Sequence, residues 1–195
     1  MAADRTYVIG VDGGGTKTLA VIMNEEGNVL ARTQGESSNI HAVPHPEVEK
    51  TLRTMVEKLC SEVGIATDDI AAICLGMAGC DSPGDRAVLD AFLRPLIGDD
   101  TKLMVINDAI VAMRAVLGKL HGLLLIAGTG SICFGWNAND GRTARCGGWG
   151  HLLADEGSGY RIGLQAMKSV LMNVDGRGED TVLKKMIMDH LKITE

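Results

Sequence analysis

The fold is decided by residues 7–23, YVIGVDGGGTKTLAVIM. The aromatic and β-branched residues predict a strand over Tyr7–Asp12, which runs into three glycines, and a second strand over Thr18–Met23. A third strand is expected over Val29–Thr33, after a short turn. Because a strand and not a helix follows the glycines, this stretch begins a β-meander.

Helices and strands alternate in the next part of the chain. Helices are predicted from Pro46 to about Val63, from Ser82 to about Leu96, and over Asp108–Leu117, with strands over Ile70–Met77 and Lys102–Asn107. The apolar residues of the first helix recur at helical spacing: Val48, Leu52, Met55, Val56 and Leu59. The pattern predicts an α/β domain over residues 1–120, with a mixed five-stranded sheet and flanking helices.

Residues 121–195 are expected to begin a second domain that is cut short. A strand over Gly122–Ala127 should be followed by a hairpin formed by Ile132–Trp136 and Thr143–Cys146. A polar, glycine-rich loop then leads to helices over Ser158–Val174 and Glu179–Leu191.

Composition excludes several classes of protein. The net charge is −6 and no basic run occurs, so a nucleic-acid partner or an anionic membrane surface is not expected. The longest apolar stretches are far shorter than the roughly 20 residues of a membrane span, and residues 1–5 run into the first strand without a signal peptide. Five cysteines without a CxxC pair indicate a reduced, cytoplasmic protein.

Glycine is unusually frequent, at 25 of 195 residues, and is concentrated in four clusters. The first cluster leads into Thr16 and Lys17 and lacks the spacing of a P-loop or of a dinucleotide fingerprint. Backbone N–H groups at a hairpin tip suit a phosphate, and Asp12 could hold Mg²⁺ through water. The alternative is a tight turn with no ligand.

A second cluster, Gly128-Thr129-Gly130-Ser131, repeats this design between two strands. Two such turns would grip a polyphosphate from two sides, whereas the alternative is two unrelated turns. Asp108 follows a strand and begins a helix, where it either caps the helix or accepts a proton from an attacking hydroxyl.

The third region joins Cys146–His151 to Asp155–Gly159. Glycines beside Trp149 and two acids suit a polar ligand such as a sugar. Trp149 would stack on a sugar face or cap the core, and His151 is better explained as structural than as catalytic. Asp155 and Glu156 could also be charges before the following helix.

Taken in this order, the motifs resemble the sugar-kinase branch of the acetate and sugar kinase, heat-shock chaperone and actin superfamily. The resemblance is strongest to the BadF/BadG/BcrA/BcrD ATPase family, which includes N-acetylglucosamine and glucosamine kinases. The segments that carry it are Asp12–Thr18, Ser38-Asn39, Ile73–Gly79, Asn107–Ala109, Ala127–Ser131 and Gly147–Ser158.

The resemblance implies two ribonuclease-H-like domains that use ATP and Mg²⁺ to phosphorylate the 6-hydroxyl of an amino sugar or N-acetylamino sugar. Asp108 would be the base, and Asp12 would order Mg²⁺. The ATP phosphates would meet Gly14, Gly15, Thr16, Lys17, Gly128, Thr129 and Gly130. The sugar would meet Asn39, Ser131, Gly148, Trp149, Gly150, His151 and Asp155. The superfamily's kinases are often dimers, so a homodimer is a further expectation.

Two other functions stay open at this point. One is an ATPase that activates a dehydratase and carries an iron–sulfur cluster, which would need suitably placed cysteine thiolates. The other is a truncated domain that binds sugar or nucleotide without turnover.

Overall fold

The structure is a computed structural model that describes residues 6–80 and 82–193. The expectation that residues 1–5 hold no signal peptide therefore lies outside the described residues. The chain divides into two compact units, residues 1–119 (unit 1) and 120–195 (unit 2).

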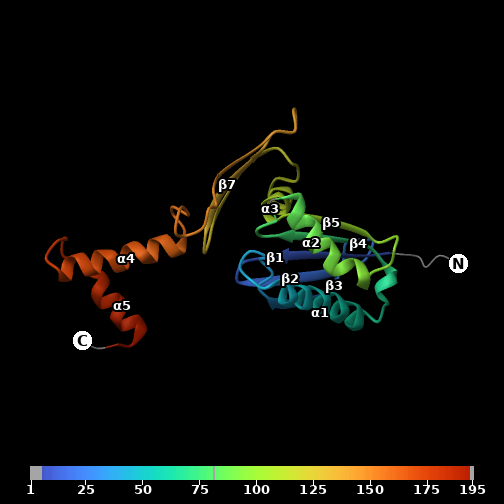
Figure 1. Cartoon of the computed structure of the whole chain (residues 1–195), viewed down its shortest axis with the longest axis horizontal. Helices are drawn as coiled ribbons and strands as arrows, with labels where there is room; N and C mark the ends of the chain where they lie inside the picture. Colours follow the sequence, from blue (N-terminus) through green and yellow to red (C-terminus); the bar gives the residue numbers. More distant parts are fainter. Residues whose placement is uncertain (1–5, 81, 194–195) are drawn as a thin grey trace. The chain divides into compact units, whose positions relative to one another are not determined.

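Unit 1 is built on a five-stranded mixed sheet in the order β3-β2-β1-β4-β5 (Figure 1). The strands are β1 (Tyr7–Gly13), β2 (Lys17–Met23), β3 (Val29–Glu36), β4 (Ile70–Met77) and β5 (Lys102–Asn107). The first three are antiparallel, whereas β1, β4 and β5 are parallel neighbours. The predicted meander and mixed sheet are confirmed.

Helices cover this sheet. They are α1 (His45–Val63), α2 (Pro83–Leu93) and α3 (Asp108–Leu117), with short 3₁₀ turns at η1 (Thr67–Asp69) and η2 (Arg94–Leu96). The five apolar residues that predict the inner face of α1 are all buried, and α1 packs on β2 and β3. Pro46 at the first turn and Gly64 in the left-handed region explain where α1 begins and ends.

Unit 2 contains a three-stranded antiparallel sheet and two helices. The strands are β6 (Gly122–Ala127), β7 (Ser131–Trp136) and β8 (Thr143–Gly147), and the helices are α4 (Gly159–Val174) and α5 (Leu183–Leu191). The predicted start of the last helix at Glu179 is wrong by four residues. The Thr181 hydroxyl accepts the N–H of Leu183, so the residues before Leu183 form a local turn instead of a first helical turn.

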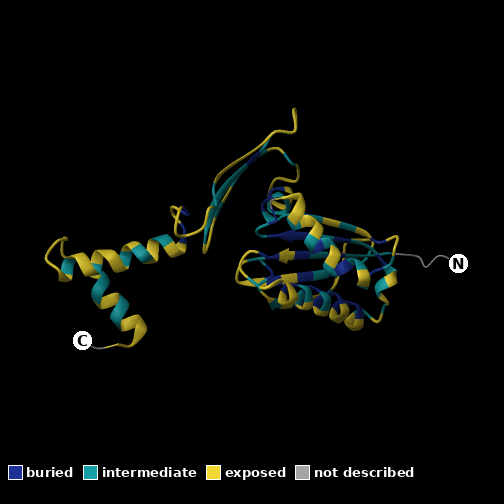
Figure 2. Cartoon of the chain, in the orientation of Figure 1, coloured by how far each residue is buried: buried dark blue, intermediate teal, exposed yellow. Residues whose placement is uncertain are grey.

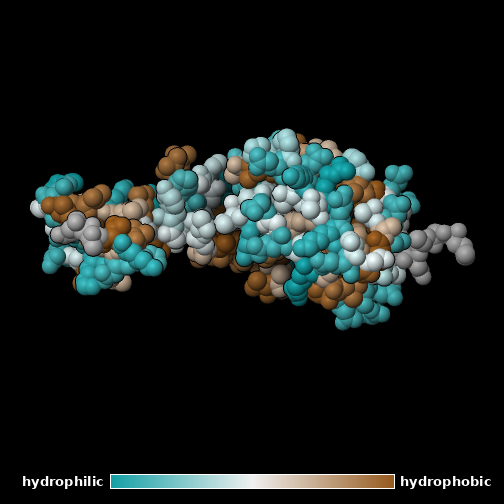
Figure 3. Space-filling view, turned by 90° about the horizontal axis from the view of Figure 1, so that it is seen from below, coloured by the Kyte–Doolittle hydropathy of each residue, from teal (hydrophilic) through white to brown (hydrophobic). Residues whose placement is uncertain are grey.

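Burial differs between the two units, as Figure 2 shows for each. Among the described residues, every buried apolar side chain except Ala154 belongs to residues 9–113 of unit 1. On α4 and α5, large apolar side chains such as Ile162, Leu171 and Leu191 are exposed. Figure 3 shows hydrophobic residues at the surface of the molecule. No helix in the described ranges is both long and apolar enough to span a bilayer.

The five cysteines form no disulfide. Burial raises the pKa of the Cys60 and Cys74 thiols, and the nearby Asp69 carboxylate raises that of Cys60 further. Cys146 on β8 is exposed.

These differences predict how the thiols react. At pH 8, where a raised pKa leaves less thiolate, a maleimide should modify Cys146 about 100-fold faster than Cys60 or Cys74. Peptide mass spectrometry of a time course measures the rates, and the denatured chain, in which all five should react alike, is the control. Equal rates at Cys60 and Cys146 in the folded chain would contradict the core that we describe.

Candidate phosphate and sugar site

The β1–β2 hairpin ends in a tight turn at residues 14–17 (turn 1). The Gly14 N–H donates to the Lys17 C=O at 3.0 Å, which leaves Gly15 and Thr16 at the exposed tip. A Cβ on Gly15 would meet no atom within 4 Å, and the φ of Gly15 lies outside the left-handed region. Neither packing nor backbone conformation therefore requires glycine at this position, whereas close approach of a ligand to the backbone would.

Residues 36–38 form hydrogen bonds with turn 1 and with the residue that follows it. The Ser37 hydroxyl donates to the Gly14 C=O at 3.2 Å. The buried Thr18 hydroxyl donates to the Glu36 C=O at 2.6 Å and shares a hydrogen bond with the buried Ser38 hydroxyl at 2.7 Å. These contacts fix the turn without using its outward N–H groups.

Two alanine substitutions separate packing from ligand binding in this hairpin. A Cβ on Gly13 would lie 2.5 Å from Met77 Sδ and 2.6 Å from Ser38 Oγ, so Gly13→Ala should cost about 1–3 kcal/mol of unfolding free energy. Gly15→Ala should instead raise that free energy by about 0.4–1 kcal/mol, because it restricts the unfolded chain.

Although Gly15→Ala should stabilise the fold, it should weaken the binding of MgATP. Its added methyl group would obstruct the backbone, and we expect the Kd of MgATP to rise about tenfold or more, the effect of one lost charge-assisted hydrogen bond. Urea unfolding and calorimetry measure the two quantities. A Gly15→Ala variant that binds MgATP as tightly as the wild type would remove turn 1 from the phosphate site.

The carboxyl ends of β1, β4 and β5 lie side by side. Gly13 pairs with Met77, and Met77 pairs with Asn107. Neighbouring strands are about 4.8 Å apart, so Gly13 and Asn107 are separated by about 10 Å along the sheet edge. Turn 1 follows Gly13 and Asp108 follows Asn107. The register therefore brings turn 1 and Asp108 to the edge at which open α/β sheets bind ligands.

Asp108 is half-buried at the first position of α3. The Ala109 N–H donates to both Asn107 Oδ1 and Asp108 Oδ1, each at 2.8 Å. A Cβ on Gly76 would lie 2.7 Å from Val111 Cγ2, so the glycine lets α3 pack closely on β4. The amino end of a helix favours the ionised carboxylate. Asn107 is the cap, and Asp108, the next residue, accepts the same N–H, so its position fits both a structural role at the helix end and a carboxylate presented at the sheet edge.

Asn39 lies at the same end of the sheet. A Cβ on Gly79, two residues beyond β4, would come within 2.8 Å of Asn39 Oδ1. That oxygen accepts the His41 N–H at 3.0 Å, which fixes the orientation of the amide. No acceptor for the Asn39 Nδ2 group occurs among residues 6–80 and 82–193, so this donor is available to a ligand.

In unit 2, residues 128–130 form a second turn between β6 and β7 (turn 2). The Gly128 N–H donates to the Gly130 C=O at 2.8 Å, and Gly128 and Thr129 are exposed. The Gly128 C=O accepts the N–H of Gly159, the first residue of α4, at 2.8 Å. Turn 2 therefore lies at the amino end of a 16-residue helix, where the helix dipole favours an anion.

Asp155 packs against turn 2. Its residue is only 7% exposed, and a Cβ on Gly130 would lie 2.9 Å from Asp155 Oδ2. None of the described residues forms a hydrogen bond or ion pair with this carboxylate. Its φ of 66° is in the left-handed region, which costs about 1–3 kcal/mol for a residue other than glycine. A buried carboxylate without a hydrogen-bond partner in the described part of the chain, on a residue in the left-handed region, indicates a functional role.

The segment 155–158 is hydrogen-bonded to the first residue of β7 and to the start of α4. The Ser131 hydroxyl donates to the Glu156 C=O at 2.8 Å, and the Ser158 N–H donates to the Asp155 C=O at 3.0 Å. Ser158 then caps α4 by accepting the Arg161 N–H. Turn 2, the segment 155–158 and the start of α4 thus form one local structure.

Trp149 is 67% exposed, which argues against the alternative that its ring covers the hydrophobic core. The Arg145 guanidinium lies 4.4 Å from the centre of its ring. His151 is also exposed, with its ring 4.3 Å from that of Tyr160. Gly148 has a φ of 72°, and a Cβ there would meet the Ile132 side chain at 2.9 Å, so glycine is required.

The sequence pattern of the BadF/BadG/BcrA/BcrD ATPase family matches residues 9–191. The chain belongs to this family. Two curated relatives in which nearly the whole chain is matched are sugar kinases by name. The N-acetylmuramic acid/N-acetylglucosamine kinase of Clostridium acetobutylicum is 42% identical over 96% of the chain and 60% of the relative. The N-acetyl-D-glucosamine kinase of Dictyostelium discoideum is 37% identical over 96% and 61%.

The solved structures agree with the fold. A protein proposed to be an N-acetylglucosamine kinase, from Chromobacterium violaceum, superposes with a TM-score of 0.78 at 27% identity, over 96% of this chain and 64% of that one. The predicted fold is thus confirmed. The chain spans about 60% of the length of the curated relatives that it matches.

The family is one of ATPases, so a nucleotide is expected. The polar groups of turn 1 are suited to bind its phosphates. Exposed N–H groups at Gly15 and Thr16, a threonine hydroxyl and the Lys17 ammonium suit an anion. Asp12 is exposed at the end of β1. No three metal-ligating side chains cluster in the described part of the chain. One carboxylate nevertheless fits Mg²⁺, which keeps several waters and takes its other ligands from phosphates.

The structure gathers most of the predicted site residues of this family member into two groups, which do not include Gly148–His151. Unit 1 brings Asp12, turn 1, Asn39 and Asp108 to one sheet edge. Unit 2 brings turn 2, Ser131 and Asp155 together. The expectation that turns 1 and 2 face each other with Asp108 beside them joins two units that are described separately, and it stays a prediction.

Sequence analysis names Thr18 and Ser38 only within a predicted strand or segments that carry the family resemblance, and it predicts no supporting role in turn 1 for them or for Ser37. Thr18, Ser37 and Ser38 make its hydrogen bonds from β2 and from the end of β3. One signal was present, since Thr18 occupies an inward position in the alternating pattern of β2, where a hydroxyl needs a partner.

Proposed function

We propose that the chain provides the phosphate turns and the catalytic base of an ATP-dependent kinase that phosphorylates the 6-hydroxyl of an amino sugar or N-acetylamino sugar, such as N-acetylglucosamine or glucosamine. The observation that carries the proposal is the register that brings turn 1 and Asp108 to one sheet edge. The names of the relatives support the substrate class. Residues 121–195 would begin the second ribonuclease-H-like domain.

In this proposal the protein positions groups and compensates charge, which is most of what phosphoryl transfer requires. The Asp108 carboxylate accepts the proton of the sugar hydroxyl as that oxygen attacks the γ-phosphorus. Backbone N–H groups of turn 1 and the Lys17 ammonium bind the phosphate oxygens, and turn 2 supplies a second set. Mg²⁺, held through Asp12 and water, would offset phosphate charge.

The sugar side uses neutral and acidic groups. Asn39 Nδ2 donates to a sugar oxygen, and the Asp155 carboxylate accepts from sugar hydroxyls, which supplies the hydrogen bonds that it lacks. Trp149 and Gly148–His151 would give the sugar further contacts. Cysteines that form no disulfide suit a reducing compartment, and we propose that the protein is cytoplasmic.

Two measurements on the same protein test the proposal. Calorimetry with N-acetylglucosamine, N-acetylmuramic acid, glucosamine and glucose tests sugar binding. A coupled ADP-release assay with MgATP and the same sugars tests turnover. We expect binding and ADP release with at least one amino sugar and neither with glucose. Binding without ADP release would indicate a non-catalytic sugar-binding protein, and the absence of both would refute the proposal.

A further inference from the structure

Two cysteines of unit 2 lie directly opposite each other. Cys133 on β7 pairs with Cys146 on β8 in the register of these antiparallel strands. Directly opposed residues point their side chains to the same face of a sheet, so the two thiols share one face. In the strands of the two sheets that the structure describes, no other cysteine is opposite a cysteine, since Cys74 on β4 pairs with Gly10 and Met104.

The hydrogen bonds of the β7–β8 hairpin fix the distance between the two backbones at this pair. The Asn137 N–H donates to the Arg142 C=O at 2.8 Å, one position beyond the end of the paired strands. Hydrogen-bonded pairs recur at every second position of an antiparallel ladder, so Cys133 and Cys146, four positions away, form such a pair. Its Cα atoms are about 5.5 Å apart, within the range of about 4.4–6.8 Å that disulfides span.

A disulfide at this position would be strained. The Cβ atoms of directly opposed residues are about 4.5–5.5 Å apart, whereas those of a disulfide are on average about 3.8 Å apart. The two strands must therefore move closer together to form the bond. Because a strained disulfide is reduced more easily than a relaxed one, this geometry suits a bond that forms and breaks and does not suit a permanent crosslink.

Small reagents can reach the pair. Cys146 is exposed and Cys133 is half-buried, whereas none of the three cysteines of unit 1 is exposed. The next pair on the same face consists of the small residues Gly135 and Ala144. Leu125, which pairs with Cys133 from β6, is 73% exposed. The thiols therefore lie on an accessible part of the face.

We propose that Cys133 and Cys146 form a modification site that small disulfides, such as glutathione disulfide, oxidise to a reversible cross-strand disulfide. The exposed Cys146 thiolate attacks one sulfur of glutathione disulfide, which forms a mixed disulfide and releases one glutathione. The Cys133 thiolate then attacks the Cys146 sulfur and releases the second glutathione. Two electrons and two protons pass from the protein thiols to the two glutathione molecules, so the reaction needs no further oxidant.

The bond would alter both ends of the proposed sugar loop. Cys146 is followed by Gly147, which has a φ of 76°. Cys133 lies two residues after Ser131, whose hydroxyl donates to the Glu156 C=O. Because closing the pair shifts both strands, we expect the Kd of the sugar to rise about tenfold, the effect of one lost hydrogen bond. This consequence rests on the proposed function, whereas the formation of the bond does not.

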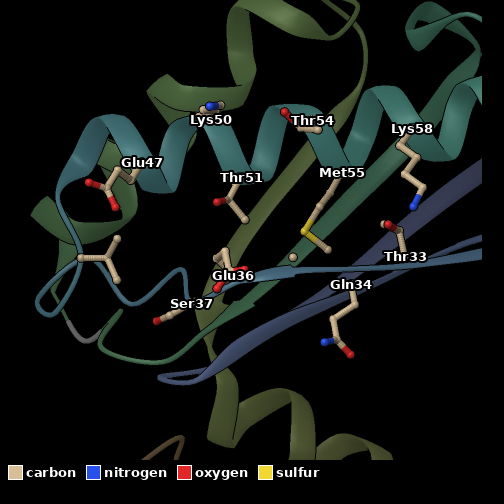
Figure 4. Close-up of a pocket in the computed structure, with 12 residues that line it drawn as sticks. Thr33, Gln34, Glu36, Ser37, Glu47, Lys50, Thr51, Thr54, Met55 and Lys58 are labelled. Atoms are coloured by element: carbon tan, nitrogen blue, oxygen red, sulfur yellow. The ribbon is translucent and has the colours of Figure 1, made fainter.

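A disulfide is a better oxidant for the test than a peroxide. The chain has 10 methionines, whose thioethers a peroxide would also oxidise. One of them is Met55, whose sulfur lines a groove of about 570 Å³ between α1 and β3 (Figure 4). Glutathione disulfide exchanges with thiols, so a change in sugar affinity after this treatment would come from the cysteines.

Mass spectrometry tests whether the bond forms. The folded chain is treated with glutathione disulfide, the remaining thiols are blocked, and trypsin then separates the two cysteines by cutting after Arg142 and Arg145. We expect two peptides joined through Cys133 and Cys146, which dithiothreitol separates again. Cys74→Ser should give the same product. Cys133→Ser should instead stop at a mixed disulfide between Cys146 and glutathione.

A shifted thiol tests the register. The double variant Arg145→Cys, Cys146→Ser moves the thiol of β8 by one residue, to the opposite face of the strand. Residue 145 pairs with Phe134 and not with Cys133, so this variant keeps two thiols in the hairpin but should not join them. Circular dichroism checks that the variants are folded.

Calorimetry on the oxidised protein, before and after dithiothreitol, tests the consequence for sugar affinity. The absence of the joined peptides from the wild type would overturn the proposal, and so would equal joining in the Arg145→Cys double variant. A bond that forms and leaves sugar affinity unchanged would overturn its effect on the sugar loop. The bond is detected without sugar or ATP, so the modification site and the proposed function can fail separately.

Discussion

Replacing Asp108 by asparagine is expected to lower kcat by about 10²–10⁴-fold, the usual contribution of a general base. The amide keeps the size of the side chain but cannot accept the proton of the sugar hydroxyl. The Asn107 cap and the packing of Gly76 against Val111 do not use the charge, so α3 should stay in place. Coupled ADP release measures kcat, and calorimetry should show sugar affinity changed by less than about tenfold.

Asp99→Asn is the matched control, because it removes an exposed carboxylate of the same unit and should leave kcat unchanged. If Asp108→Asn turns over at the wild-type rate, Asp108 is not the base. If it loses sugar binding and folded structure together, the residue has a structural role instead.

At Asp155 we expect stability and binding to change in opposite directions. Asp155→Asn replaces a buried carboxyl group that has no hydrogen bond or ion pair among the described residues by an amide, which costs less to bury, so the free energy of unfolding should rise by about 1 kcal/mol. Sugar affinity should fall about 10–100-fold, because a hydrogen bond to a charged acceptor is lost. Urea unfolding and calorimetry give the two numbers.

Glu156→Gln is the control, since it removes the neighbouring exposed carboxylate and should change neither quantity. A less stable Asp155→Asn variant with unchanged sugar binding would show that the carboxylate supports the loop and does not serve a ligand.

Most of the fold follows from local patterns in the sequence. The alternation of apolar and polar residues and the glycines between the two strands locate the β1–β2 hairpin. The helical spacing of Val48, Leu52 and Leu59 locates α1. The start of α5 is missed because the Thr181 hydroxyl bonds to the backbone in a local turn, and such a turn is a weaker signal in the sequence than the charged residues around it.

The site is only partly predictable, because its decisive contacts join distant residues. Sequence places Asp108 after a strand, but only the register of three parallel strands shows that it shares an edge with turn 1. Likewise, nothing local to Asp155 reveals that its carboxylate lies against Gly130 or that its backbone is strained. Tertiary contacts of this kind have no periodic signature.

The uneven distribution of buried apolar side chains has a practical consequence for handling this chain. Local opening is cheapest where few apolar contacts must be broken, and proteases cut open segments. Brief digestion with trypsin should therefore nick the region after Lys119 first, at sites such as Arg177 and Lys184, and leave a resistant fragment that retains β1–β5. That fragment would be the natural starting material for spectroscopy on turn 1.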